Sequence, residues 1–210
     1  MSVAANDRLV DANPFARVRL LLDDDSAARE VLTADDLTKV FAKLPAEEWW
    51  VARIGLYSGA RLGEICQLTK SDIQIIDGVA CFVIKPDAEA GKSVKTQSSI
   101  RKVPIHRQLL TDGVLEWIEG RPSDRLFTFD SAAASKRLNR RMRDAGMGKG
   151  KVFHSFRHTF KGAARRHMEQ EWHDRLTGHA ATSVGQSYGD YDIRTLKEKI
   201  DLIEFGATKR

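Results

Sequence analysis

Two short segments near the C-terminal end of the sequence carry side chains that can act on a phosphodiester. His154 and Arg157 are three residues apart, and His179 is followed nine residues later by Tyr188. Far upstream, Arg61 follows a Gly-Ala pair. Two arginines can bind phosphate oxygens through paired hydrogen bonds, and a histidine can accept or donate a proton near neutral pH. A tyrosine hydroxyl can be a covalent nucleophile. The set needs no metal, and it predicts covalent chemistry on a phosphodiester.

In chain order these residues form the pattern Arg…Lys…His-x-x-Arg…Gly-His…Tyr, with 22 residues from Arg157 to His179. The pattern resembles the catalytic domain of the tyrosine recombinases, the phage-integrase type of site-specific DNA recombinase, over roughly residues 31 to 203. Single pieces such as His-x-x-Arg arise by chance, whereas the full set in this order is specific. The resemblance implies DNA cleavage and rejoining through a 3′-phosphotyrosyl intermediate, without metal or ATP, as in the integrase of a prophage or other mobile genetic element.

The nucleophile of such a site depends on nearby cations. A free phenol has a pKa of about 10, so cations must lower that pKa or assist the transition state. Tyr188 is the expected nucleophile, and Tyr191, about one helical turn further on, is the alternative. Arg61 and Arg157 are expected to bind the non-bridging oxygens, where negative charge grows during attack. Glu64 is expected to orient Arg61 without touching the substrate.

Two histidines complete the predicted phosphate site. The resemblance implies that His154 and His179 hydrogen-bond the scissile phosphate, with His154 as the expected acceptor of the Tyr188 proton. His154 and His158 also have the i, i+4 spacing of zinc ligands. Zinc enzymes with that spacing place a Glu beside the first His, and Ser155 stands there instead. We therefore expect no metal and no other cofactor.

In the family, a lysine between two strands of a small sheet protonates the leaving 5′ oxygen. Lys95 begins the segment that best matches the family's Lys-Thr…Arg-x-Val-Pro pattern, and it is the expected general acid. The gap of 34 residues from Arg61 to Lys95 is long for the family. Lys92 therefore stays open as the alternative.

The positive charge of the chain is unevenly distributed. The net charge is +5 and the isoelectric point is near 9.3, with a basic block directly before the His-x-x-Arg motif. Such a block predicts a face that binds nucleic acid, although a solvated helix face is the alternative interpretation. The expected DNA-contacting side chains are Arg101, Lys102, Arg137, Arg140, Arg141, Arg143, Lys149 and Lys151.

The elements that must position these residues can be located from local patterns. A capping box at Thr33 begins a helix that stops near Pro45, and Gly59 ends an apolar helix. The Asp77-Gly78 pair predicts a type I′ hairpin turn. Further elements are expected as helices at 49–57 and 61–68, strands at 73–76, 79–84 and 101–106, and mostly helix from residue 108 onward. The predicted fold class is α+β, mostly α-helical with one small three-stranded antiparallel sheet, which is the tyrosine recombinase catalytic fold.

Three segments are expected along the chain. Residues 1–30 are predicted to be a linker or arm, 31–192 the catalytic domain, and 193–210 a C-terminal helix or tail. The family usually has a separate helical DNA-binding domain, for which about thirty residues are too few, so we expect a catalytic fragment or a naturally short member. The final helix has an apolar stripe, which can pack on its own chain, the favoured option, or dock on a neighbour. The stripe comprises Ile193, Leu196, Ile200 and Ile203.

The resemblance implies double-stranded DNA as the partner, a tetramer on DNA, and a monomer for the free fragment. No apolar run reaches membrane-spanning length, and no secretory signal is present. Cys66 and Cys81 stand in apolar surroundings and are expected to be reduced core residues. We therefore expect a protein of the bacterial cytoplasm that acts on DNA, without a membrane partner. A type IB topoisomerase and a catalytically inactive DNA-binding regulator of the same fold are the alternatives.

Overall fold

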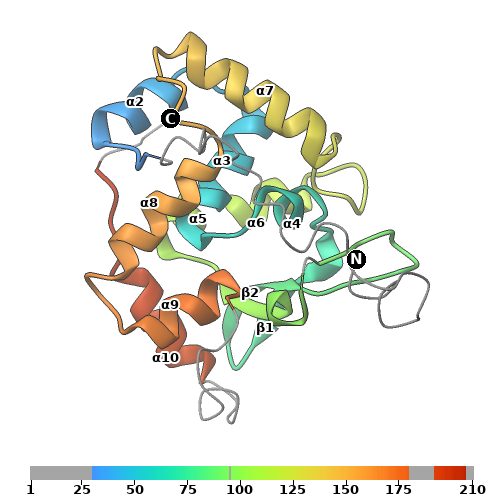
Figure 1. The fold of residues 1–210 in the computed structure, drawn as a ribbon. Helices are drawn as coiled ribbons and strands as arrows, with labels where there is room; N and C mark the ends of the chain where they lie inside the picture. The colour runs from blue at the N-terminus through green and yellow to red at the C-terminus, as the bar shows by residue number, and fades with distance from the viewer. Residues whose placement is uncertain (1–29, 95, 180–191, 207–210) are drawn as a thin grey trace, which may run out of the picture.

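The structure, a computed structural model, describes residues 30–94, 96–179 and 192–206. In these ranges helices surround one three-stranded antiparallel sheet (Figure 1). The helices are α2 (Ala34–Phe41), α3 (Ala46–Ser58), α4 (Leu62–Cys66), α5 (Arg107–Thr111), α6 (Val114–Glu119), α7 (Ser131–Asp144), α8 (His154–Ala164), α9 (Gln170–Thr177) and α10 (Ile193–Asp201). The strands are β1 (Ile73–Ile76), β2 (Val79–Ile84) and β3 (Arg101–Pro104). The predicted fold class is confirmed.

Strands β1 and β2 form the hairpin that the Asp77-Gly78 pair predicts. Both turn residues have positive φ angles, 50° at Asp77 and 80° at Gly78, as a type I′ turn requires. In the sheet, Phe82 of β2 lies opposite Ile73 on one side and Val103 on the other. The strand order is therefore β1-β2-β3.

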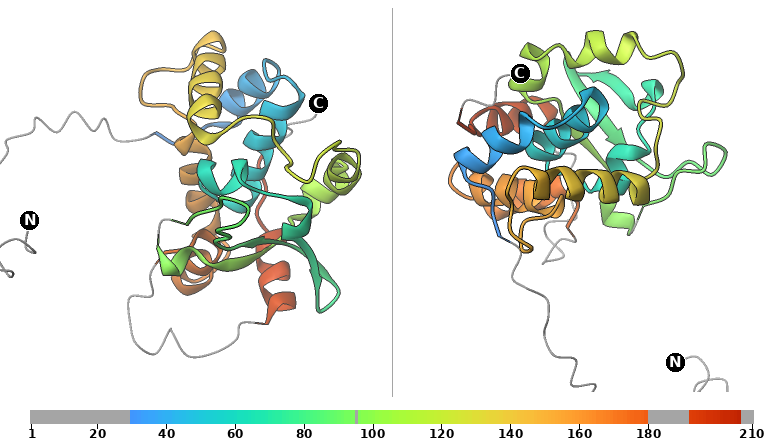
Figure 2. Two further views of the ribbon diagram at one scale, coloured as in Figure 1. Left: turned by 90° about the vertical axis from the view of Figure 1, so that its right-hand side faces the viewer. Right: turned by 90° about the horizontal axis from the view of Figure 1, so that it is seen from above.

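The third strand is shorter than the expected 101–106, because the next helix begins almost at once. The Ile105 backbone N–H still donates to Ala80 O at 2.8 Å. His106, however, is the N-cap of α5, and its Nδ1 accepts from the Gln108 N–H at 2.9 Å. Figure 2 shows the C-terminal helices beside the sheet, where α9 and α10 both contact β3. Side chains of β3 therefore face the part of the chain that carries the Gly-His motif.

Helix α2 begins where the capping box predicts. Thr33 Oγ1 accepts from the Asp36 N–H at 3.2 Å, and Asp36 Oδ2 accepts from the Thr33 N–H at 2.8 Å. The helix ends at Phe41, before the predicted stop near Pro45, and α3 begins directly after that proline. Turn hydrogen bonds follow the helix, from the Lys43 N–H to Val40 O at 3.0 Å and from the Leu44 N–H to Phe41 O at 3.4 Å. The chain therefore stays coiled up to Leu44, the residue in which a following proline disfavours helical backbone.

Helix α3 runs through the core, and most of its residues are buried. Gly59 ends it in the left-handed conformation at φ 63°, as predicted. A Cβ atom at Gly59 would lie 2.5 Å from Phe160 Cδ1, so glycine is required where the end of α3 meets α8. This close approach brings the turn that carries Arg61 next to the helix that carries His154 and Arg157.

The predicted apolar stripe packs on the chain's own core, which is the favoured expectation, although its last member, Ile203, lies just beyond the end of α10. All four side chains are buried, and α10 contacts β2 and β3. The segment after α10 is held as well, because Ile203 O lies 2.9 Å from His106 Nε2. The members of the stripe are Ile193, Leu196, Ile200 and Ile203.

Candidate active site

Arg61 and Glu64 form a fixed pair at the start of α4. The Arg61 backbone N–H donates to Glu64 Oε2 at 2.8 Å, and its Nη1 donates to Oε1 at 2.9 Å. Glu64 is buried, and it also accepts from Arg101 Nη2 at 2.8 Å. Burial acts to raise the pKa of the Glu64 carboxyl, but hydrogen bonds and charge from Arg101 and Arg61 outweigh it and lower that pKa. Glu64 therefore stays ionised and holds two guanidinium groups.

The Arg61 guanidinium reaches the segment that carries the Gly-His motif. Its Nη2 donates to Gly178 O at 3.2 Å, and its Nη1 donates to Ser99 Oγ at 3.2 Å. A quarter of the side chain is exposed, at 25%. Arg61 thus connects α4, the β2–β3 connection and the end of α9, while part of its guanidinium stays accessible.

Arg157 projects from α8 into the same site. It is 3% exposed, and it donates from Nη2 to Thr177 O at 2.6 Å and from Nη1 to Gly59 O. Among the described residues no carboxylate pairs with it. Burial, and then the charges of Arg61 and Arg101, lower its pKa to about 9, so it stays protonated at neutral pH. The site therefore holds a buried positive charge that is bonded to carbonyl oxygens.

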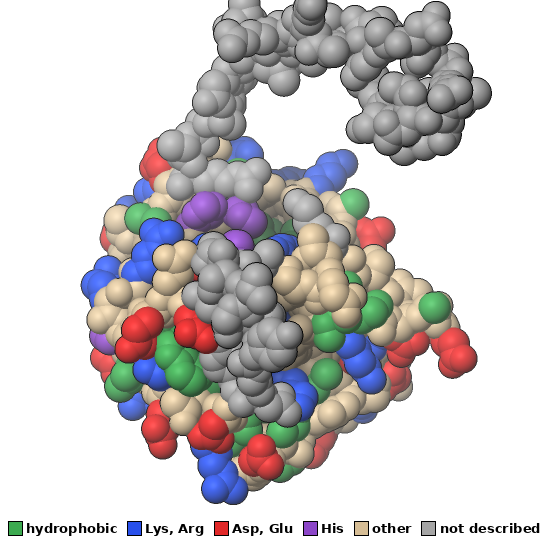
Figure 3. All heavy atoms as spheres, turned by 60° about the horizontal axis from the view of Figure 1, so that its bottom comes forward, with side chains coloured by type: hydrophobic (Ala, Val, Ile, Leu, Met, Phe, Trp, Pro, Cys, Tyr) green, Lys and Arg blue, Asp and Glu red, His purple; other side chains and the backbone are tan. Residues whose placement is uncertain are grey.

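The two histidines of the His-Ser-Phe-Arg-His motif lie on α8. His154 begins the helix and shares a face with Arg157, as the i, i+3 spacing predicts. His158 is on the same stripe, and its ring centroid is 4.8 Å from that of His154. Figure 3 shows histidine side chains gathered on one face of the molecule, with lysine and arginine side chains around them. His154, His158 and the buried Arg157 thus lie on one side of α8.

Gly178 ends α9 with a φ of 66° and places His179 beside α8. A Cβ atom at Gly178 would lie 2.8 Å from a guanidinium nitrogen, so both space and backbone conformation require glycine. His179 Nδ1 is 2.7 Å from Thr177 Oγ1 and 3.5 Å from Arg157 Nη2. Burial, and then the charges of Lys161 and Arg157, lower the pKa of His179 to about 4. The imidazole is therefore neutral at neutral pH.

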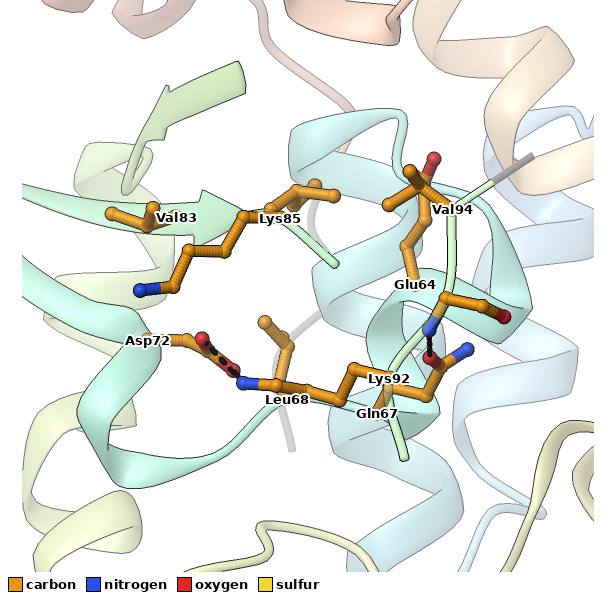
Figure 4. A pocket seen from close by; sticks show the side chains of 10 residues that line it. Glu64, Gln67, Leu68, Asp72, Val83, Lys85, Lys92 and Val94 are labelled. Carbon is orange, nitrogen blue, oxygen red and sulfur yellow. Dashed lines mark hydrogen bonds and ion pairs between the residues drawn. The ribbon is translucent and has the colours of Figure 1, made fainter. Parts of the chain in front are cut away.

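Lys92, the alternative general acid, is buried in an ion pair. Its Nζ is 2.8 Å and 2.9 Å from the two carboxylate oxygens of Asp72 and 3.3 Å from Thr69 Oγ1. Figure 4 shows the side chain of Lys92 directed at Asp72. The backbone of Lys92 also exchanges two hydrogen bonds with Asp87, at 2.7 Å and 3.1 Å. Lys92 thus ties the β2–β3 connection to the short 3₁₀ helix η1 (Lys70–Asp72).

Three residues of the predicted site lie outside the described residues: Lys95, Tyr188 and Tyr191. The structure therefore places the phosphate-binding candidates but neither the nucleophile nor the general acid. The roles expected of these three residues stay predictions.

The expected DNA-contacting side chains fall into different environments. Arg101 is buried against Glu64 and donates from Nε to Leu176 O at 2.7 Å, so it supports the site and lacks the surface position expected of a DNA contact. Lys151 is half-buried and donates to Asp36 Oδ2 at 2.7 Å. The remaining candidates are exposed or half-exposed: Lys102, Arg137, Arg140, Arg141, Arg143 and Lys149.

Sequence reasoning missed three side chains of the site: Lys161, Asp174 and Thr177. Lys161 Nζ lies 3.4 Å from His179 Nε2. Asp174 Oδ1 lies 3.7 Å from His179 Nδ1 and 3.9 Å from Lys161 Nζ. Lys161 follows Arg157 by four residues on α8, so helical spacing could have located it. Asp174 and Thr177 depend on how α9 packs, which no local pattern reveals.

Other kinds of site are not found in the described part of the chain. No group of three or more His, Cys, Asp or Glu side chains there could hold a metal ion. No helix in these ranges is long and apolar enough to cross a membrane. Cys66 and Cys81 are buried free thiols, and burial raises their pKa values to about 12 and about 11. Both are therefore core residues and poor nucleophiles.

Comparison with known proteins identifies relatives of this arrangement. The sequence matches the phage integrase family over residues 30–192, whereas no curated protein matches it. The crystal structure of XerA recombinase is 19% identical with a TM-score of 0.56, covering 83% of this chain and 63% of that one. The lambda integrase catalytic core is 18% identical with a TM-score of 0.54, covering 72% of this chain and 96% of that one. A lambda integrase tetramer bound to a Holliday junction is 18% identical with a TM-score of 0.64, covering 91% of this chain and 57% of that one.

The chain thus spans less than two thirds of the length of XerA recombinase and of the lambda integrase chain in that tetramer. At these identities the solved structures establish the shared fold. The match over residues 30–192 includes every described side chain of the site.

Proposed function

Since the chain belongs to the phage integrase family, a family of DNA strand-transferring enzymes, we propose that it contains the catalytic domain of a site-specific DNA recombinase. The observation that carries the proposal is the buried charge of Arg157 beside Arg61, which carbonyl oxygens hold in place. Two such guanidinium groups suit the non-bridging oxygens of a phosphodiester, where negative charge grows during attack. The proposed substrate is therefore a DNA strand.

The proposed phosphate site is preorganised by the backbone around it. An arginine has five N–H donors, and Arg157 uses only some of them on Thr177 O and Gly59 O. The bonds to carbonyl oxygens fix the direction of the remaining donors before DNA binds, which lowers the cost of reorganisation in the transition state. Arg61, held by Glu64, offers the second guanidinium, and His154 completes the proposed site from the same face as Arg157.

The proposed reaction joins the chain covalently to DNA. The Tyr188 hydroxyl attacks the scissile phosphorus, its proton passes to His154, and a 3′-phosphotyrosyl bond forms. The bond from phosphorus to the bridging 5′ oxygen breaks, and Lys95 supplies the proton that makes a free 5′ hydroxyl. Because the phosphotyrosyl bond conserves the energy of the phosphoester, a 5′ hydroxyl from another strand can reverse the step without ATP.

The ion pair of Lys92 favours Lys95 as the proposed general acid. To reach a leaving oxygen, the Lys92 ammonium would have to abandon the Asp72 carboxylate in a buried position. Breaking a buried pair of this kind costs about 3–5 kcal/mol. Lys95 lies three residues further along the same connection. The role of Lys92 in this proposal is to anchor that connection.

Double-stranded DNA is the proposed partner, in the bacterial cytoplasm. Helix α7 exposes arginine side chains that can contact phosphates, among them Arg137, Arg140 and Arg143. A lambda integrase of the same fold forms a tetramer on a Holliday junction, which supports a tetramer for this chain on DNA. Without DNA we propose a monomer, because α10 covers its own core.

A nicked suicide duplex tests the proposal directly. The chain is incubated with nicked duplexes that carry sites selected by its own DNA binding, and the denatured products are separated. We expect a covalent protein–DNA adduct whose modified peptide contains Tyr188. DNA binding without an adduct would favour an inactive regulator, and relaxation of supercoiled DNA that lacks the selected site would favour a type IB topoisomerase.

A further inference from the structure

Lys161 places an ammonium group inside the candidate site. It follows Arg157 by four residues and His154 by seven, so all three lie on one stripe of α8. Its side chain is only 19% exposed, although a lysine on a helix surface normally extends into water. Its Nζ is 3.4 Å from His179 Nε2 and 3.9 Å from Asp174 Oδ1. Both contacts are longer than the 2.7–2.9 Å typical of a charge-assisted hydrogen bond.

Three polar side chains lie against the ring of His179. Thr177 Oγ1 has a single proton, which it donates to His173 O at 2.7 Å. His179 Nδ1 lies 2.7 Å from that hydroxyl oxygen and 3.5 Å from Arg157 Nη2. Nε2, the other nitrogen of the ring, lies 3.4 Å from Lys161 Nζ. Lys161 thus places an ammonium donor directly beside the imidazole of His179.

The charged groups around Lys161 carry a net positive charge, which an anion would neutralise. The site brings together four cations and two carboxylates, namely Arg61, Arg101, Arg157 and Lys161 with Glu64 and Asp174. Burial lowers the pKa of Lys161, and the charges of Arg157, Arg165 and Arg61 lower it further against the opposing effect of Asp174. Two positive charges are therefore in excess over the carboxylates. A phosphodiester brings one negative charge and gains more on its non-bridging oxygens during attack.

We propose that Lys161 is a third phosphate-binding cation of the catalytic site, which contacts a non-bridging oxygen of the scissile phosphate when DNA is bound. In the DNA-free chain its ammonium lies 3.4 Å from His179 Nε2, and a phosphate oxygen, which carries negative charge, is a stronger acceptor for that ammonium. Lys161 and His179 would then face the same phosphate from adjacent positions. This inference rests on the proposed function, because it assumes that the site receives a DNA phosphate.

The first test is the single-turnover rate of adduct formation on the nicked suicide duplex. Lys161→Gln removes the charge and should slow the reaction roughly 100-fold, the lower end of the scale for one lost transition-state donor. Lys161→Arg keeps a cation and should retain most of the rate. Lys197→Gln is the matched control, because Lys197 has a similar exposure of 20% but is already paired with Asp201 at 2.5 Å. A wild-type rate in Lys161→Gln would overturn the inference.

The second test separates phosphate contact from an effect on His179 alone. In the Tyr188→Phe background, which should bind DNA without reacting, affinity is measured across a salt series. Loss of one phosphate contact should reduce the slope of log affinity against log salt by about 0.9 in Lys161→Gln and leave it unchanged in Lys197→Gln. An unchanged slope in Lys161→Gln would contradict direct contact. A wild-type chain that binds DNA but never forms the adduct would instead defeat the proposed function, while the slope would still decide the contact.

Discussion

Two buried arginines of this chain are held in opposite ways. Arg53 on α3 is 1% exposed, is paired with Asp112, and has its guanidinium carbon 4.9 Å from the centroid of the Trp49 ring. Arg157 on α8 is 3% exposed, and its guanidinium donates to backbone carbonyl oxygens, among them Thr177 O. A buried cation is normally paired with an anionic group, most often a carboxylate. Burial alone therefore does not distinguish the two arginines, whereas the kind of partner does.

The lysines show the same contrast. Lys92 is buried with both oxygens of Asp72 within 2.9 Å of its Nζ, so its charge is neutralised. Lys161 is largely buried, and its nearest carboxylate oxygen among the described residues is 3.9 Å away. The neutralised cations, Arg53 and Lys92, hold elements together. Arg157 and Lys161, which lack a carboxylate at hydrogen-bond distance, lie in the candidate active site, where an anionic substrate would supply the missing negative charge.

Replacing Arg157 or Arg53 by alanine should have the largest effects, on cleavage in the first case and on stability in the second. Arg157→Ala should raise the barrier to adduct formation by about 3 kcal/mol or more, because one transition-state donor is lost. Arg53→Ala should lower the free energy of unfolding by about 3–5 kcal/mol, because Asp112 loses its partner in a low-exposure position. Single-turnover cleavage and denaturant unfolding measure the two effects. The contrast fails if Arg157→Ala cleaves at nearly the wild-type rate while folded.

The two lysines of the β2–β3 connection should differ in their response to the leaving group. Lys95→Ala should slow cleavage roughly 100-fold, the scale of general acid catalysis. A duplex with sulfur in place of the bridging 5′ oxygen has a leaving group that needs no proton, so it should restore that rate. Lys92→Ala should lose stability, because Asp72 is left buried and unpaired, and sulfur should restore nothing. Rescue of Lys92→Ala in place of Lys95→Ala would reverse the two assignments.

A neutral buried histidine outside the site should produce a smaller, pH-dependent effect. Burial lowers the pKa of His106 to about 4, from 6.5. Between these values the unfolded chain binds a proton that the folded chain does not. The free energy of unfolding should therefore fall on acidification from about pH 6.5 towards pH 4, by at most about 1.4 kcal/mol per pH unit. Denaturant unfolding at pH 7 and pH 5 measures this fall, and His106→Gln should reduce it; an equal fall in both proteins would contradict the pKa shift.

Arg140 and Arg141 of α7, which are exposed and half-exposed, should contribute the smallest effect. Arg140→Gln combined with Arg141→Gln should flatten the salt dependence of DNA binding by one to two units, at roughly 0.9 per phosphate contact. The loss of affinity should be similar for all DNA sequences, because phosphate contacts carry no sequence information. Filter-binding or fluorescence titrations across a salt series measure the slope. An unchanged slope would make this side of α7 an ordinary solvated face.

Local patterns were sufficient for the elements that position the site. The Thr33 capping box, the Asp77-Gly78 turn and the helix break at Gly59 all depend on neighbouring residues, and each is present as predicted. The i, i+3 spacing likewise put His154 and Arg157 on one face of a helix. These features need no knowledge of tertiary packing.

Packing between distant elements could not be predicted in the same way. Arg101 was expected on a DNA-facing surface, but its guanidinium is buried between Glu64 and the end of α9. The alternation of a strand did contain a signal, because Lys102 is exposed while Arg101 and Val103 are buried. Which of the two faces of β3 is buried, however, depends on the long-range contact of β3 with α9. The hydrogen bond from Arg101 to Glu64 is likewise long-range, and it makes Glu64 the partner of two arginines.

The identity of the attacking residue tests the central claim most directly. Tyr188→Phe removes one oxygen, so it should abolish the covalent adduct on the nicked suicide duplex while leaving DNA affinity nearly unchanged. Tyr191→Phe is the matched control and should still form the adduct. An adduct from Tyr188→Phe that disappears in Tyr191→Phe would contradict the assigned nucleophile, and an adduct from both variants would contradict tyrosine attack at either position.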